Sequence, residues 1–363
     1  MGDGNVKQKL KSRRVSTLAW DDKSLRLIDQ RELPFKEIYI NCSSTEQVVS
    51  AIKDMVVRGA PAIGVTAAYG TAIAAGKFRG SDKDEFLSHM ENSIKILSGA
   101  RPTAVNLFWA LNCMKKILHE SKHLTVDEIK QKLLDKAKKI EEEDLSINYR
   151  IGKNGKDIFN KNKNKLKVLT HCNAGALATS GYGTALAVIR SLHSAGKIEN
   201  IIVDETRPYL QGARLTAWEL YQEKIPFFII TDNMAGYFMS KKMVDVVIVG
   251  ADRVALNGDS ANKIGTLGVS ILAKYYDIPF YIAAPKSTID TGICNGDDIP
   301  IEERKPSEVR EVMGTRIIPD YMPVRNPSFD VTPSENITAI ITEEDVVYPP
   351  FGKNLAQLMK NKI

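Results

Sequence analysis

Five short apolar runs recur along the second half of the chain, separated by segments long enough for helices. Each run is rich in Val, Ile, Leu or Phe, and they occupy residues 167–172, 200–204, 226–231, 245–250 and 279–284. Such runs are typical of strands that are buried on both faces of a sheet. Their alternation with helical segments predicts an α/β fold with a doubly wound, mostly parallel sheet. Ligands bind beside the carboxyl ends of such strands, so the residues after each run are the first candidates for a site.

The first half of the chain has a different pattern. Residues 16–44 alternate short apolar runs with charged turns, which predicts a small antiparallel β element. From Thr45 to about residue 154 the apolar residues recur with helical spacing. Pro61 fits the start of an Ala-rich helix, and Thr125 with Glu128 forms a capping box that opens a long charged helix.

These changes of pattern divide the chain into four parts. We expect a basic, mobile tail over residues 1–15 and a β element followed by a mostly helical domain over 16–154. The stretch 155–166 is polar and rich in Lys and Asn, which predicts a linker or exposed loop. Residues 167–363 then form the α/β domain.

Composition narrows the class of protein. Of the 363 residues, 43% are hydrophobic, and 50 Lys and Arg against 44 Asp and Glu give a net charge of +6. The basic residues are dispersed, which favours anionic small molecules over nucleic acid as partners. The four cysteines form no CxxC pair, the N-terminus resembles no signal peptide, and no apolar run is long enough to span a membrane. We therefore expect a soluble cytoplasmic protein that does not bind membranes.

Two short motifs invite functional readings that their context does not favour. His119 to His123 matches the HExxH pattern of zinc proteases, but the capping Thr125 places His123 in a connection and not on one helix face. Residues 181–186 (GYGTAL) resemble a dinucleotide fingerprint, with Asp204 as the acidic partner, but Leu186 stands where Gly or Ala belongs. We expect no metal, and a nicotinamide cofactor is a minor alternative.

Two reactive groups follow predicted strands. His171 and Cys172 follow directly on the strand expected at residues 167–170 and precede a Gly- and Ala-rich segment, whose free N–H groups would lower the pKa of the Cys172 thiol. Asp252 follows the run at 245, where partial burial would raise the pKa of its carboxyl and make it a general acid. A buried structural Cys and an Asp that caps a turn are the alternative interpretations.

Several cationic and amide side chains lie at predicted helix starts, where anions bind. Arg58 precedes the segment Gly59-Ala60-Pro61, and Arg101 precedes Pro102 in the same way. Further candidates for contacts to a phosphate or a sugar hydroxyl follow later strands: Arg207, Gln211, Asn262 and Lys263. The two Arg-containing segments are expected to face the sheet domain across a cleft.

In combination and in this order, the strings RGAPAIG, RPTAVNL, HCNAG, ETRPYLQGARLT, TDNMAG, GADR and NKIGT make the sequence similar to the 5-methylthioribose-1-phosphate isomerase family of methionine salvage. The resemblance extends from about residue 17 to 353. Ribose-1,5-bisphosphate isomerases and the regulatory subunits of a guanine-nucleotide-exchange initiation factor belong to the same group of relatives.

The resemblance implies an enzyme that converts an aldose 1-phosphate into the matching ketose 1-phosphate, with no cofactor. It implies a helical N-terminal domain, a Rossmann-like C-terminal domain and a homodimer. It assigns Asp252 as proton donor and Cys172 as a group that assists the transition state, by stabilising it or as a base. It also implies substrate contacts from residues that match the family motifs: Arg58, Gly59, Ala60, Arg101, Gln211, Asn262 and Lys263.

The resemblance leaves two alternatives to a methylthioribose-1-phosphate isomerase: an isomerase that acts on ribose 1,5-bisphosphate, and a non-catalytic regulatory subunit. A methylthio substituent needs an apolar wall, for which Trp20, Phe108 and Trp109 are candidates, whereas a second phosphate needs a second cation, for which Arg207 is the candidate. A non-catalytic subunit would have no chemical need for Cys172 and Asp252 together.

Overall fold

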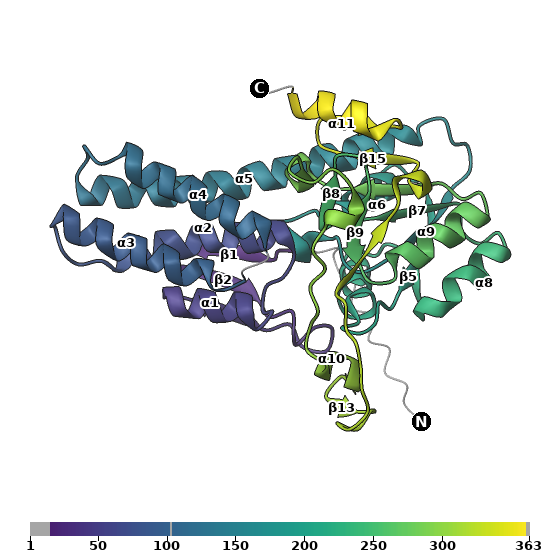
Figure 1. Cartoon of the computed structure of the whole chain (residues 1–363), viewed down its shortest axis with the longest axis horizontal. Coiled ribbons are helices and arrows are strands. Elements are labelled where there is room, and N and C mark those ends of the chain that lie inside the picture. The colour runs from purple at the N-terminus through teal and green to yellow at the C-terminus, as the bar shows by residue number, and fades with distance from the viewer. Residues whose placement is uncertain (1–14, 102–103, 361–363) are drawn as a thin grey trace, which may run out of the picture.

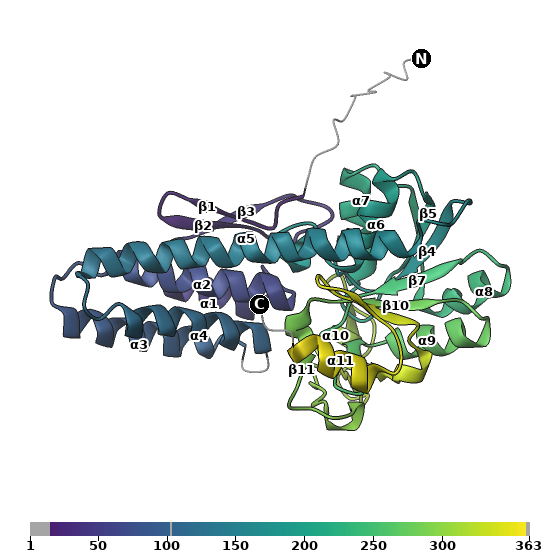
Figure 2. The same cartoon turned by 90° about the horizontal axis from the view of Figure 1, so that it is seen from above.

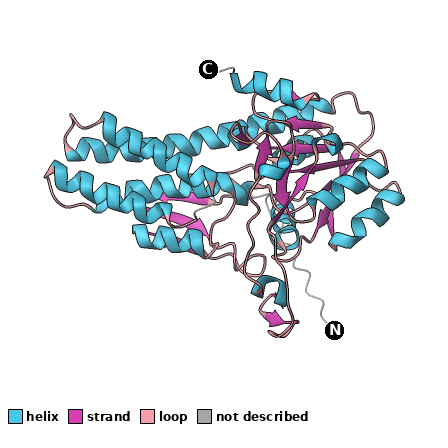
Figure 3. Ribbon diagram, viewed as in Figure 1, coloured by secondary structure: helices cyan, strands magenta, loops and turns pink. Residues whose placement is uncertain are grey.

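The computed structural model describes residues 15–101 and 104–360. It has two parts: an elongated bundle of helices and a broader α/β region at one end of it (Figure 1). The strands gather in the α/β region, apart from a small sheet that lies along the bundle (Figure 3). None of the described helices combines the length and apolar composition that crossing a membrane requires.

The N-terminal part begins with the predicted antiparallel β element. Three strands pair in the order β1-β2-β3, with bounds Leu18–Asp21, Ser24–Ile28 and Tyr39–Cys42. The predicted tail is too long by one residue, because the Val15 side chain is buried against Ile28, Leu33 and Leu177. Residues 1–14 lie outside the described part of the chain.

Five helices form the bundle: α1 (Thr45–Lys53), α2 (Ala60–Lys77), α3 (Lys83–Ser98), α4 (Val105–Glu120) and α5 (Val126–Ile158). Helix α2 is apolar all round and is buried among α1, α3, α4 and α5. Pro61 lies in its first turn and the capping box at Thr125 opens α5, both as predicted. Helix α4 ends at Glu120, so His123 lies in the following connection and the HExxH pattern is not on one helix.

Helix α5 joins the two parts of the molecule. Its 33 residues extend about 50 Å at 1.5 Å per residue, and it packs against α2 and α4 at one end and α6 at the other (Figure 2). Residues 155–158, expected in a linker, form its last turn instead. A Cβ on Gly155 would lie 2.4 Å from Val188, so this glycine brings α5 close to α6 and does not mark a loop.

The α/β region contains a seven-stranded sheet in the order β16-β15-β10-β7-β4-β5-β6. Its strands pair in parallel except at the β16 edge, which confirms the predicted fold class. Their bounds are β4 Leu166–Thr170, β5 Ile198–Asp204, β6 Phe227–Ile230, β7 Val246–Val249, β10 Phe280–Ala283, β15 Ala339–Ile341 and β16 Val346–Val347.

Helices cover both faces of this sheet. One apolar core joins it to α5, α6 (Ala185–Ser194) and α7 (Ala217–Gln222), and a second joins it to α8 (Ala235–Ser240), α9 (Thr266–Tyr275) and α11 (Phe351–Lys360). Burial on both faces explains why the strands are continuous apolar runs in the sequence.

A second sheet of four short strands was not predicted. Its order is β11-β8-β9-β14, with bounds Ile289–Asp290, Arg253–Ala255, Ser260–Lys263 and Phe329–Thr332. Between β11 and β14 a long excursion carries α10 (Ser307–Arg310) and the hairpin of β12 (Glu311–Val312) and β13 (Thr315–Arg316), which projects below the body in Figure 1. This sheet places β9 and the excursion beside the carboxyl ends of β4 and β7.

Candidate active site

A cavity of about 560 Å³ lies where the helix bundle meets the carboxyl edge of the large sheet. Its wall is built from the starts of α2 and α4, the segments after β4 and β7, strand β9, and residues at the start of the excursion. The catalytic and substrate-contact residues that the family resemblance implies all line it: Arg58, Gly59, Ala60, Arg101, Cys172, Gln211, Asp252, Asn262 and Lys263. The bundle and the sheet domain thus both contribute residues to the wall of one cavity.

Cys172 is half-buried and adopts a strained backbone conformation. Its φ of +63° lies in the left-handed region that residues with a side chain seldom occupy. Two threonine hydroxyls hold the backbone there: Cys172 N–H donates to Thr206 Oγ1 at 2.8 Å, and Thr216 Oγ1 donates to the Cys172 carbonyl at 2.6 Å. Strain that is held in place by several partners is characteristic of functional positions.

The sequence-based expectation for the Cys172 thiol was wrong in direction. Burial raises its pKa, although Lys263 and Arg58 act in the opposite sense. The loss of hydration of a thiolate therefore outweighs the attraction of the two nearby cations. The group that faces the cavity is a thiol.

Asp252 lines the cavity with an exposed side chain. Desolvation by the surrounding protein atoms raises the pKa of its carboxyl, while Lys263, Arg101 and Arg58 moderate the rise and Glu302 adds to it. The direction is the one predicted from its place after a buried strand. A carboxyl of this kind can carry a proton at higher pH than an exposed one.

Arg58 is held at the cavity by a chain of buried hydrogen bonds. Its guanidinium donates to both the backbone and the side-chain oxygen of Asn173. The Asn173 amide in turn donates to Glu219 Oε1 at 2.8 Å, and Arg190 donates to Glu219 Oε2 at 2.7 Å. Glu219, which is fully buried, also accepts the backbone N–H groups of Ala176 and Leu177.

None of these supporting residues was singled out from the sequence. Glu219 lies 46 positions from Asn173 along the chain, and only the fold brings them together. A local signal did exist for the turn at residues 212–216, where Gly212 lies against strand β5. A Cβ there would be 1.7 Å from the Asp204 carbonyl oxygen, so the wide π-helical turn after Gln211 requires glycine.

The start of α2 supplies backbone N–H groups to the cavity, as predicted. Gly59 has a φ of +94°, and a Cβ on it would lie 2.4 Å from the Ala178 carbonyl oxygen. Glycine therefore lets the helix start approach the sheet region and leaves its N–H groups open to an anion. Helix α4 begins at Val105, and Pro102, the expected helix start, lies outside the described residues.

Lys263 is buried on β9, with its ammonium 4.7 Å from the centre of the Phe329 ring. Burial lowers its pKa, while Cys172 and Asp252 act in the opposite sense. Asn262 donates to Thr266 Oγ1 at 3.0 Å, at the predicted start of α9. Arg101 lies 3.8 Å from the Glu302 carboxylate of the excursion.

Three candidates for substrate selection do not line the cavity: Arg207, Trp20 and Trp109. The Arg207 guanidinium donates to the backbone carbonyls of Pro208 and Val309, so it does not supply a second cation. Trp20 stacks on Tyr69 in the bundle, and Trp109 does not line the cavity. Phe108 does line it, together with the apolar side chains of Met55, Ile63, Val105, Ile301 and Phe329.

The fingerprint-like turn at 181–186 packs against another loop of the chain, which leaves no space there for a ligand. A Cβ on Gly183 would lie 2.6 Å from Gly175, so this glycine allows two loops of the chain to pack together. Asp204 is fully buried and faces His171, which removes it as a ligand for a ribose. The dinucleotide interpretation has no support in this geometry.

Comparison with known proteins agrees with these features. Residues 56–349 match the Initiation factor 2 subunit family. A methylthioribose-1-phosphate isomerase of Caldicellulosiruptor saccharolyticus is 54% identical over 93% of this chain and 98% of its own length, and one of Thermotoga neapolitana is 52% identical over 95% and 98%. The chain belongs to the methylthioribose-1-phosphate isomerase family.

Solved structures show the same relationship. The crystal structure of 5-methylthioribose 1-phosphate isomerase from Pyrococcus horikoshii has a TM-score of 0.92 and 45% identity, covering 100% of both chains. A structure described as translation initiation factor eIF-2B, subunit delta, from A. fulgidus has a TM-score of 0.86 and 44% identity, covering 95% of this chain and 99% of its own. Fold likeness alone thus does not separate an isomerase from an initiation-factor subunit, but the curated relatives at 54% and 52% identity are isomerases and make this chain an isomerase.

Proposed function

We propose that the enzyme converts 5-methylthio-ribose 1-phosphate into 5-methylthio-ribulose 1-phosphate, with Asp252 as proton donor. The observation that carries this proposal is the cavity that holds a carboxyl of raised pKa, a thiol and several cations together. An aldose that carries phosphate at C1 cannot open its ring by loss of a hydroxyl proton. The ring oxygen must instead be protonated while the C1–O4 bond breaks, and this step needs a carboxylic acid that is still neutral.

The phosphate is assigned to the cationic part of the cavity. Arg58, Arg101 and Lys263 supply charge, and the backbone at Gly59 and Ala60 supplies N–H groups at a helix start. Gln211 and Asn262 are assigned to hydroxyl and phosphate oxygens as neutral hydrogen-bonding groups. These contacts would keep C1 and C2 in register with Asp252 and Cys172.

The raised pKa of Cys172 favours one of two routes for the hydrogen that moves from C2 to C1. An enediolate route needs a base, and a buried thiol is a poor base. In a hydride route, hydrogen moves with its electron pair to the cation at C1, and the C2 hydroxyl loses its proton to the carboxylate formed on Asp252. We therefore expect deuterium placed at C2 to be retained in the product, as measured by NMR after turnover in ordinary water. Its wash-out would favour the enediolate route.

The apolar part of the cavity favours a methylthio substituent over a second phosphate. Phe108, Met55 and Ile301 line it, and Arg207 is held elsewhere by backbone carbonyls. Arg304, a further cation of the lining, is already paired with Glu308 at 2.5 Å. A ribose 1,5-bisphosphate isomerase would need a cation free to meet the second phosphate.

Asp252→Asn and Cys172→Ala test the assignment, because each removes one reactive group with little change in volume. General acid catalysis contributes about 10²- to 10⁴-fold, so Asp252→Asn should lower kcat by that order. Cys172→Ala should also lower kcat, and circular dichroism should show an unchanged fold for both variants. Wild-type turnover should be faster with methylthioribose 1-phosphate than with ribose 1,5-bisphosphate, and the reverse order would favour the alternative.

Two coarser properties belong to the same proposal. We expect a homodimer in solution, which light scattering coupled to size-exclusion chromatography measures directly. We also expect a cytoplasmic location, in keeping with a small phosphorylated substrate.

A further inference from the structure

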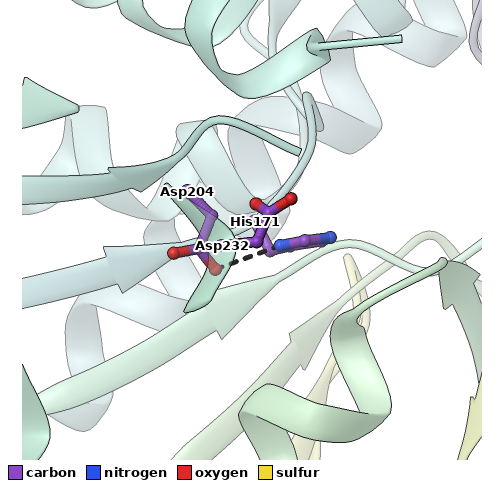
Figure 4. A group of neighbouring side chains, drawn as sticks. All are labelled: His171, Asp204 and Asp232. Atoms are coloured by element: carbon purple, nitrogen blue, oxygen red, sulfur yellow. Dashed lines mark hydrogen bonds and ion pairs between the residues drawn. The ribbon is translucent and has the colours of Figure 1, made fainter. Parts of the chain in front are cut away.

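His171, the residue before Cys172, is clamped between two acceptors behind the cavity. Its side chain is 1% exposed. Nδ1 lies 3.0 Å from Asp204 Oδ2 at the end of β5 (Figure 4). Nε2 lies 2.9 Å from the Ile264 carbonyl oxygen in the turn between β9 and α9. Both ring nitrogens are therefore engaged, so His171 cannot act as a base toward a substrate.

The partners indicate which protons the ring carries. A carbonyl oxygen accepts only, so Nε2 must bear a hydrogen. The charged groups that face the ring are all acidic: Asp204 on β5, Asp232 after β6, and Asp330 on β14. Cys172 is the next residue along the chain, and Lys263 precedes Ile264, whose carbonyl oxygen accepts from the ring. Burial lowers the pKa of the His171 ring, but the hydrogen bond and charge of Asp204, the charge of Asp232 and the hydrogen bond to the Ile264 carbonyl together raise it by more. The balance favours the doubly protonated, positively charged form.

The same geometry argues against a metal ion. Ligand atoms of His171, Asp204 and Asp232 lie within 4.8 Å of one another, which is the spacing of a metal cluster. However, both carboxylate oxygens of Asp232 already accept hydrogen bonds, from the backbone N–H groups of Thr206 and Arg207, each at 2.7 Å. A ring with hydrogens on both nitrogens has no lone pair to give to a metal.

The His171 ring connects two segments that contribute candidate site residues to the cavity. His171 is covalently joined to Cys172, the next residue. Its ring donates a hydrogen bond to the Ile264 carbonyl oxygen, in the turn that follows Asn262 and Lys263. Gly265 in this turn packs directly on the ring, because a Cβ there would lie 2.8 Å from His171 Cε1. Asp330 fixes the other side of the turn by accepting the N–H groups of Gly265 and Leu267.

We propose that His171 is a positioning residue, kept as a buried imidazolium, that fixes the strand end bearing Cys172 against the turn that follows Asn262 and Lys263. The effect on turnover rests on the proposed isomerase function, but the protonation state does not. Loss of either hydrogen bond would leave a buried polar group unpaired and allow the two segments to shift. A displacement of about 1 Å in such a site can cost about 10²-fold in rate.

The first test uses the wild-type enzyme without substrate. Nitrogen NMR of enzyme with labelled histidine should show one of the five histidines with both nitrogens protonated from about pH 6 to 9. His171→Asn, which keeps a donor toward Asp204 but cannot reach Ile264, identifies this signal by its disappearance. A signal that titrates like an exposed histidine, or one metal ion per chain by elemental analysis of the purified enzyme, would overturn the proposal.

The second test measures turnover, with His193→Asn as the matched control at the end of α6. His171→Asn should lower kcat by about 100-fold while KM changes much less, and the control should match wild type. Asp204→Asn keeps an oxygen that can accept from Nδ1 but removes the charge, so the imidazolium should lose its proton more easily. Its activity relative to wild type should therefore fall as pH rises from about 6 to 8.

The outcomes separate the two proposals. A wild-type enzyme that shows no turnover of either sugar phosphate rejects the proposed function, whereas the NMR result stands by itself. Wild-type kcat in His171→Asn, or a wild-type pH profile in Asp204→Asn, rejects the positioning role even if the isomerase is active.

Discussion

The interior of the helix bundle and the carboxyl edge of the large sheet bury side chains of opposite character. Around α2 the core consists of Ala, Val, Ile, Leu, Met and aromatic residues, and polar residues buried there, such as Thr66 and Thr71, are uncharged. At the sheet edge the buried side chains include Arg58, Glu219 and Lys263. Burying charge is costly unless it is paired, so its concentration at one edge marks the place where chemistry requires it.

The comparison also separates two sources of stability. The bundle is held by apolar burial, which tolerates modest changes of shape. The sheet edge is held by a hydrogen-bonded network, in which removal of one member leaves its partners unpaired. Equal losses of stability in the two regions should therefore have unequal effects on activity.

The largest effect in this comparison is expected for Glu219→Gln. The new amide group cannot accept from Asn173, Arg190 and two backbone N–H groups at once, as the carboxylate does. Breaking a buried ion pair costs about 3–5 kcal/mol, so we expect the free energy of unfolding to fall by about that amount in urea titration. Because Asn173 would release Arg58, KM should rise as well.

Phe86→Ala in the bundle is the matched control. Phe86 is fully buried and packs edge-on against Phe78, just past the end of α2 that lies away from the cavity. Loss of a buried phenyl ring also costs about 3–5 kcal/mol. We expect kcat and KM to stay at wild-type values below the unfolding temperature. An equal effect of both variants on KM would contradict the separation of the two regions.

The elements were predictable where the signal is local. Runs of apolar residues identified β4, β5, β6, β7 and β10, and the residues after β4 and β7 contain Cys172 and Asp252. Caps and helix-start prolines identified α2 and α5. These features depend on neighbours within a few positions, which a single sequence contains.

What the sequence did not reveal depends on contacts between distant positions. Arg207 was expected to meet a phosphate, but carbonyls about one hundred positions later hold it. The direction of the Cys172 pKa depends on burial, which local order does not show. Gly155 looked like part of a flexible linker because its partner, Val188, lies on another helix.

A smaller effect is expected where the bundle meets the cavity. Phe108 on α4 lines the apolar wall, so Phe108→Ala should weaken selection for the methylthio group. Loss of one apolar contact in a pocket changes kcat/KM by about 10-fold or more. We expect this loss with methylthioribose 1-phosphate and little change with ribose 1-phosphate. Trp109→Ala is the control, and an equal loss with both sugars would remove Phe108 from the specificity wall.

The smallest effect is expected for the contribution of the Asp252 carboxyl to the free energy of unfolding. The folded-state pKa of Asp252 is raised above its ordinary value of 3.8. At pH below 3.8 the carboxyl is neutral in both folded and unfolded chains, and its partial desolvation in the cavity costs little. As pH rises through the folded pKa, the unfolded chain binds fewer protons than the folded one, and this contribution to stability is lost.

Asp252→Asn removes that pH-dependent cost, because an amide stays neutral. We expect its Tm to rise relative to wild type as pH increases from about 4 to 8, although its kcat is expected to fall. Asp298→Asn, on an exposed turn, is the control and should follow wild type throughout. A Tm difference that stays constant with pH would mean that Asp252 is hydrated in the folded enzyme. The pKa of the Asp252 carboxyl would then be raised only when substrate binds, and not by the protein atoms around it.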